Sequence, residues 1–142
     1  DELIRAGISV RRDNRVYDMF RQRAIFPIID AQGRVLGFGG RAMGWMDLLG
    51  HEMAIELTGC QTMFTFSADK IKFLKPVFPG ETVEVVSEVE EKGAVKLLLR
   101  LTVWADPDGE QRRKALTGIF TFIATDDKFR PVRLRYRDES QG

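Results

Sequence analysis

The sequence has one cysteine, one histidine and no long hydrophobic run. Cys60 cannot form a disulfide within the chain, and one cysteine with one histidine does not supply the ligands of a zinc site. No apolar stretch approaches the roughly 18 residues that suggest a membrane helix, and no secretory leader is recognisable. We therefore expect a soluble cytoplasmic protein with no bound metal and no membrane partner.

A strong net charge is also lacking, although the charges are unevenly distributed. The 142 residues include 22 lysines and arginines against 21 aspartates and glutamates, a formal charge of +1. Residues 1–41 hold eight arginines, five acidic residues and no lysine, which gives +3 and leaves −2 for 42–142. This balance argues against a generally basic nucleic-acid-binding surface. The change in basic residue type indicates two segments of different origin inside one domain-sized chain.

Hydrophobic residues make up 44% of the chain, enough for a packed core, and their spacing predicts one long helix. We expect this helix over 41–58, with Gly59 as its C-terminal stop. Its apolar stripe consists of Ala42, Met46, Leu49, Met53 and Leu57. The neighbouring face is small and polar and consists of Met43, Asp47, Gly50, His51, Ala54 and Thr58. An acidic residue in the middle of that face makes Asp47 a candidate functional residue.

Most of the remaining chain alternates between apolar and polar residues, as β-strands do. The expected strands are 8–10, 16–20, 24–29, 34–38, 62–74, 82–90, 95–105 and 112–125. A change of phase near Asp69-Lys70 predicts a β-bulge. One helix with several long antiparallel strands is an α+β layout, and a curled sheet wrapped around the helix is the hot-dog fold. Such a sheet leaves an edge strand exposed, so we expect a homodimer or a dimer-based oligomer.

From Phe38 onward the sequence resembles the hot-dog acyl-CoA thioesterases. The segment at the helix start is Phe38-Gly39-Gly40-Arg41-Ala42-Met43-Gly44-Trp45-Met46-Asp47. Downstream matches are Thr65-x-Ser67-x-Asp69-x-x-x-Phe73-Leu74-Lys75-Pro76-Val77, Pro79-Gly80-Glu81 and Phe120-Thr121-Phe122-Ile123-Ala124. The resemblance implies hydrolysis of acyl-CoA thioesters to free acid and coenzyme A, with no cofactor apart from the coenzyme A of the substrate.

The first part of the chain, about 7–41, is similar to the N-terminal subdomain of the bacterial DNA primase catalytic core. The similarity rests on Arg11-Arg12-Asp13-Asn14-Arg15-Val16-Tyr17-Asp18 and on the following residues through Gly37-Phe38-Gly39-Gly40-Arg41. In those primases the metal-binding acids lie in a downstream subdomain that does not follow here, so we do not expect primer synthesis. Both resemblances include the tetrapeptide at 38–41. We interpret the chain as a recombined or designed chimera, a single hot-dog domain over 1–142 in which 7–41 replaces the first strand and loop.

The thioesterase resemblance assigns roles to several residues. It places Asp47 at the catalytic carboxylate, acting as general base or as nucleophile. Backbone N–H groups near Gly39 and Gly40 at the helix start would polarise the thioester carbonyl. His51 lies one turn after Asp47 and is either a second catalytic group or a hydrogen-bonded bystander.

The substrate-binding residues are less sharply defined. Thr65 and Ser67 would either face the pocket from the partner subunit or be ordinary strand residues. Lys75 is a candidate contact for the coenzyme A phosphates, as are Lys92 and Lys96. Cys60 is expected to be a small buried residue, because no basic partner adjoins it.

Two hypotheses remain as alternatives to acyl-CoA hydrolysis. One is a chimera that retains the hot-dog scaffold with little or no catalytic activity. The other is weak single-strand nucleic-acid binding by the basic first segment with Tyr17, Phe20 and Phe26. We do not expect this binding, because recruitment of the segment into the sheet would require those rings in the core.

Overall fold

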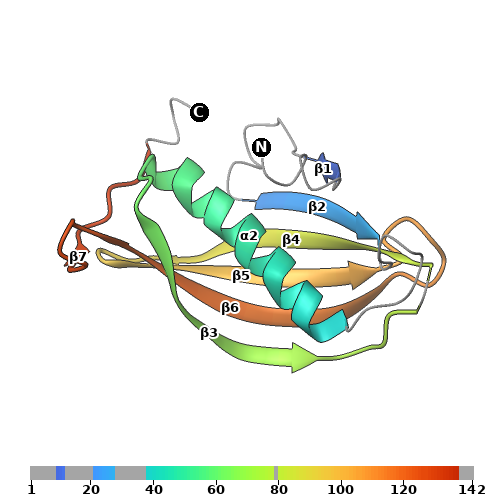
Figure 1. The fold of residues 1–142 in the computed structure, drawn as a ribbon. Helices are drawn as coiled ribbons and strands as arrows, with labels where there is room; N and C mark the ends of the chain where they lie inside the picture. The colour runs from blue at the N-terminus through green and yellow to red at the C-terminus, as the bar shows by residue number, and fades with distance from the viewer. Residues whose placement is uncertain (1–8, 12–20, 28–37, 79, 138–142) are drawn as a thin grey trace.

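The computed structural model describes residues 9–11, 21–27, 38–78 and 80–137, with side chains described for 41–78 and 80–137. Within these residues one long helix, α2 (Phe38–Thr58), crosses one face of a curved antiparallel sheet (Figure 1). The strands are β1 (Ser9–Arg11), β2 (Arg21–Pro27), β3 (Met63–Phe73), β4 (Thr82–Lys92), β5 (Lys96–Ala105), β6 (Arg113–Thr125) and β7 (Pro131–Val132). This arrangement confirms the predicted α+β hot-dog fold.

The strand order of the sheet is β1-β2-β4-β5-β6-β3, with β7 paired to the end of β6. β2 pairs with β4 from Arg21↔Glu88 to Pro27↔Thr82. The prediction that Ala24–Ile29 pairs into the sheet is therefore confirmed as far as Pro27. The expected strand at 16–20 lies outside the described residues, as does the expected strand at 34–38 except for Phe38, which belongs to α2 instead.

α2 begins earlier than the sequence predicted and ends where it predicted. Gly39 and Gly40 belong to its first turn, whereas we expected them to separate a strand from a helix at Arg41. Each glycine costs about 1 kcal/mol of helix propensity relative to alanine, but packing of the following residues against the sheet outweighs this cost. At the other end Gly59 has a φ of 71° and its N–H donates to the carbonyl of Ile55 at 2.6 Å, a left-handed helix stop.

The hydrophobic core lies between α2 and strands β4, β5 and β6. The predicted stripe of Ala42, Met46, Leu49, Met53 and Leu57 is buried throughout. It faces alternate residues of the strands, including Val83, Val85, Leu97, Leu99, Leu101, Phe120 and Phe122. Gly50 also faces the sheet, because a Cβ there would lie 3.0 Å from Cζ of Phe122. The absence of a side chain at Gly50 thus makes room for a ring of the core.

β3 is an edge strand and is mostly exposed. It pairs with β6, and register shifts fall between Thr65 and Ser67 and between Asp69 and Lys72. The second shift confirms the predicted bulge, and Lys70 there has a φ of 54°. Beyond the buried Met63, the strand exposes three large rings, those of Phe64, Phe66 and Phe73. The sheet therefore ends in an unpaired apolar edge among the described residues.

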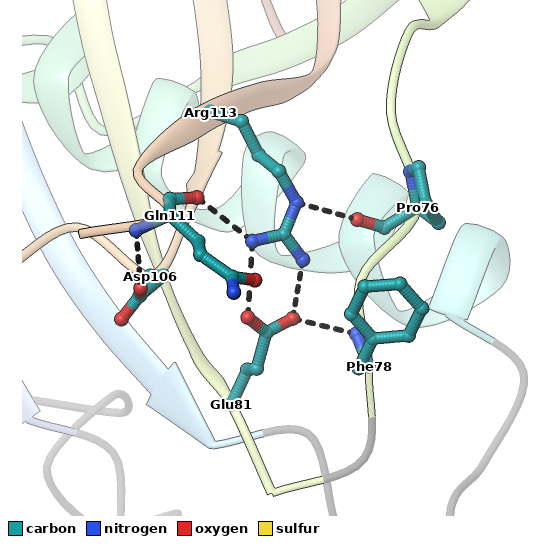
Figure 2. A network of polar contacts seen from close by, with 6 residues as sticks. All are labelled: Pro76, Phe78, Glu81, Asp106, Gln111 and Arg113. Atoms are coloured by element: carbon teal, nitrogen blue, oxygen red, sulfur yellow. Dashed lines mark hydrogen bonds and ion pairs between the residues drawn. The ribbon is translucent and has the colours of Figure 1, made fainter. Parts of the chain in front are cut away.

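At one end of the sheet, a polar network joins the turn after β3 to the hairpin between β5 and β6 (Figure 2). The guanidinium of Arg113 contacts the carboxylate of Glu81 and donates to the carbonyls of Pro76 and Gln111. Glu81 in turn accepts the N–H of Phe78 at 2.7 Å. The partly buried ion pair between Arg113 and Glu81 thus holds these two connecting segments together.

Candidate functional site

Asp47 lies in the middle of α2 on a half-buried face that looks toward β3. Its Oδ1 accepts a hydrogen bond from the hydroxyl of Thr65 in the same chain. We expected Thr65 to reach the pocket from a partner subunit or to be an ordinary strand residue, and the structure instead joins it to Asp47 of its own chain. The carboxylate is therefore held in a defined direction by a neighbouring strand.

His51 follows Asp47 by one helical turn and makes a second contact with β3. Its Nε2 lies 2.8 Å from the backbone carbonyl oxygen of Met63. A carbonyl oxygen can only accept, so this contact requires a proton on Nε2. The ring centroid lies 6.2 Å from that of Phe122, so the imidazole also packs on the core.

These side chains line a groove of about 370 Å³ between α2 and the start of β3. Its lining residues are Gly44, Asp47, Leu48, His51, Met63, Phe64 and Thr65. A carboxylate, a hydroxyl and an imidazole are thus placed between apolar walls. This combination suits acid–base or nucleophilic chemistry.

The sequence did not identify all of these lining residues. Gly44 and Leu48 were missed, although they lie three residues before and one residue after Asp47 and continue its helical face toward His51. A Cβ at Gly44 would have no described atom within 4 Å, so this glycine opens the groove. The carbonyl of Met63 carries no signal in the sequence, because every residue has one.

The predicted oxyanion-stabilising group lies elsewhere on the helix. Gly39 and Gly40 are in the first turn of α2, where backbone N–H groups have no acceptor within the helix and carry the positive end of its dipole. Seven residues separate Gly40 from Asp47, which corresponds to about 10 Å along the axis. The two groups of one chain are therefore about two helical turns apart.

The remaining predicted binding residues lie outside the groove. The hydroxyl of Ser67 donates to Oδ2 of Asp69 at 3.0 Å, and Lys75 is exposed in the turn after β3. The ammonium groups of Lys92 and Lys96 lie over the rings of Tyr136 and Phe66, at 5.4 and 4.6 Å from the centroids.

Cys60 and the metal-ligating residue types add no further site. Cys60 is half-buried with Sγ 3.2 Å from the hydroxyl of Thr62. Among the described residues no three His, Cys, Asp or Glu side chains come together as a metal site would require. In the same part of the chain no helix has both the length and the apolar character to span a membrane.

Comparison with known proteins defines the class. The thioesterase superfamily matches residues 37–111, more than half of the chain, and the N-terminal domain of the DNA primase catalytic core matches residues 1–51. The chain belongs to the thioesterase superfamily, and a segment similar to the N-terminal domain of the DNA primase catalytic core lies before and across the start of its helix.

Individual relatives show the same division. The acyl-CoA thioester hydrolase YciA of Escherichia coli (strain K12) is 30% identical over 102 residues, covering 68% of this chain and 76% of that protein. The crystal structure of a hexameric thioesterase from Yersinia pestis has a TM-score of 0.65 and 30% identity, covering 80% of this chain and 92% of the other. The DNA primase of Clostridium acetobutylicum is 55% identical over 42 residues, and the chain spans only 7% of its length.

Proposed function

We propose that this protein hydrolyses acyl-CoA thioesters to the free acid and coenzyme A, with Asp47 as the catalytic carboxylate. The observation that carries the proposal is the hydrogen bond from Thr65, which orients Asp47 inside an apolar groove. The relative from Escherichia coli is named as an acyl-CoA thioester hydrolase, which supports this substrate class.

Two routes of hydrolysis use the same carboxylate. As a general base, Asp47 takes a proton from water while the water oxygen bonds to the carbonyl carbon of the thioester. The carbon–sulfur bond then breaks, and the thiolate of coenzyme A receives the proton. As a nucleophile, Asp47 itself displaces the thiolate and forms an anhydride, which water opens. A single turnover in isotopically labelled water separates general-base attack from an anhydride that water opens at the Asp47 carbonyl. The first puts one labelled oxygen into the acid, whereas the second leaves both oxygens of the acid unlabelled and places the label in Asp47.

The distance between the helix start and Asp47 favours a site shared by two copies of the chain. The N–H groups at Gly39 and Gly40 can stabilise the negative oxygen of the intermediate only within hydrogen-bond distance. They lie about 10 Å along the helix from Asp47 of the same chain. A homodimer in which the first turn of one helix faces Asp47 of the partner would satisfy both requirements. The exposed apolar edge of β3 supports such an association.

The proposal includes the origin of the scaffold and the binding of coenzyme A. We propose that 1–142 is one hot-dog domain in which 7–41 replaces the first strand and loop; the pairing of β2 with β4 supports this. Ser67 is half-buried and Lys75 is exposed, and Lys75 would contact a phosphate of coenzyme A.

The test is thiol release from short, medium and long acyl-CoA substrates by wild type and by Asp47→Asn. Removal of a general base lowers turnover by ~100-fold or more. The turnover of Asp47→Asn should therefore be lower than that of wild type by at least this factor, with the fold and the oligomeric state unchanged. Asp127→Asn is the matched control, since Asp127 is exposed in the turn after β6. Equal turnover by wild type and Asp47→Asn would exclude this site. No turnover by wild type on any chain length would favour a hot-dog scaffold that has lost catalysis.

A further inference from the structure

Two hydrogen bonds connect the same face of α2 to the same strand. Asp47 accepts from Thr65, and His51 donates to the carbonyl of Met63. The helix advances about 6 Å between positions 47 and 51. The strand advances about 6.6 Å between positions 63 and 65. Because these two spacings agree, both bonds can form at once without deforming either element.

The strand needs such an attachment at this point. Among the described residues, β3 pairs on one side only, with β6, and its register shifts immediately after Thr65. At a bulge the regular ladder no longer fixes the direction of a side chain. The contact between His51 and Met63 fixes the strand two residues before Thr65, the residue that orients Asp47 and the last one in register before the shift.

The ring of His51 is itself held in place. Phe122 supports it from the core, and the acceptor carbonyl determines which nitrogen carries the proton. Protonation of Nδ1 would leave the Nε2–H donor in place, so this contact does not depend on the neutral form of the ring.

We propose that His51 is a positioning residue of the hydrolytic site: through the carbonyl of Met63 it sets where Thr65 meets Asp47, and it does not itself transfer a proton to or from the substrate. This inference rests on the proposed function for its kinetic consequence. Its structural part, the control of β3 by His51, can be tested whether or not the chain hydrolyses thioesters.

Three substitutions separate positioning from proton transfer. The amide nitrogen of His51→Gln can occupy the place of Nε2 and donate to Met63, whereas His51→Asn is too short and His51→Ala has no donor. A displacement of catalytic groups by about 1 Å can cost up to ~100-fold in rate, so His51→Ala and His51→Asn should lower kcat by about 10-fold or more with KM little changed. His51→Gln should retain most of kcat and the wild-type pH profile. If kcat falls as much in His51→Gln as in His51→Ala, the imidazole itself takes part in proton transfer and the proposal is wrong.

A double-mutant cycle identifies the route of the effect. If His51 acts through Thr65, adding His51→Ala to Thr65→Val should cost much less than His51→Ala costs alone. Fully additive losses would contradict the proposal.

Nuclear magnetic resonance supplies the readout that does not require turnover. The nitrogen shifts of wild type should show the proton of neutral His51 on Nε2. The backbone amide of Thr65 should shift in His51→Ala and His51→Asn and stay near wild type in His51→Gln. A proton on Nδ1, or an unchanged Thr65 signal in a folded His51→Ala, would overturn the assignment. An inactive wild type that still shows these shifts would refute the proposed function and leave the positioning role standing.

Discussion

Arg113 holds Glu81 through both of its terminal nitrogens, with Nη1–Oε2 at 3.0 Å and Nη2–Oε1 at 2.5 Å (Figure 2). The hydrogen bond from Arg113 is the main reason why the pKa of Glu81 is lowered from its ordinary value of 4.5. Glu81 begins the segment leading into β4 and Arg113 begins β6, so the pair closes the end of the sheet. The N–H of Phe78 adds to the same effect by donating to the carboxylate.

This pair predicts a pH-dependent contribution to stability. A carboxylate whose pKa is lowered by folding contributes fully above its unfolded pKa and loses that contribution as the pH falls through the folded value. Glu81→Gln should therefore unfold at lower urea concentration than wild type at pH 7. The difference should shrink once the pH drops below about 4, where the unfolded-state carboxyl becomes protonated. Urea titrations between pH 7 and pH 3 measure this, and a constant difference across that range would contradict it.

Two glycines of α2 should respond oppositely to substitution by alanine, because Gly44 lies beside the groove and Gly50 beside the core. Gly44 has open space around its missing side chain, so Gly44→Ala should stabilise the fold by about 0.5–1 kcal/mol through helix propensity. Gly50 lies against Phe122, and a Cβ there would be 3.0 Å from the ring. Because Phe122 is fully buried and cannot easily move, overpacking by about 1–3 kcal/mol should exceed the gain of up to about 1 kcal/mol in helix propensity, so Gly50→Ala should destabilise the fold. Denaturant unfolding of both variants checks the pair, and the same sign for both would show that the assignment of the two faces is wrong.

The exposed edge of β3 predicts association through its rings. In a two-fold interface each substituted residue occurs twice, so Phe66→Lys introduces two like charges and also meets Lys96, which lies over the Phe66 ring. Light scattering should show wild type at a multiple of 16.2 kDa and Phe66→Lys shifted toward one chain at micromolar concentration. Phe129→Lys is the control, because Phe129 has the highest exposed fraction, 78%, among the large apolar side chains that the structure describes, and it lies outside β3. Wild type at the mass of one chain would contradict both the interface and a site shared between copies.

The sequence predicted the parts of the fold that depend on neighbours along the chain. A stripe every three to four residues fixed which side of α2 is buried, and Gly59 marked its end by supplying the left-handed backbone that other residues avoid. The bulge near Lys70 was predicted from a change of phase in the alternation of apolar and polar residues along the chain. The start of α2 at Phe38 could not be predicted in this way. Two glycines lower the helix propensity locally, and the packing that compensates for them comes from strands that are distant in the sequence.

The sequence by itself thus determined the fold class, the two family resemblances and the candidate carboxylate at position 47. Only the tertiary structure decided that Thr65 orients that carboxylate and that His51 holds the strand at Met63. Asp47 and Thr65 are 18 positions apart in the sequence, and His51 and Met63 are 12 apart. Each contact joins a helix, with 3.6 residues per turn, to a strand, whose side chains alternate every two residues. Periodicity shows which face a residue occupies, but the meeting of two faces depends on where a bulged edge strand passes the helix. That crossing is set by the packing of the whole sheet, and one of the two contacts uses a backbone carbonyl that no side-chain pattern records.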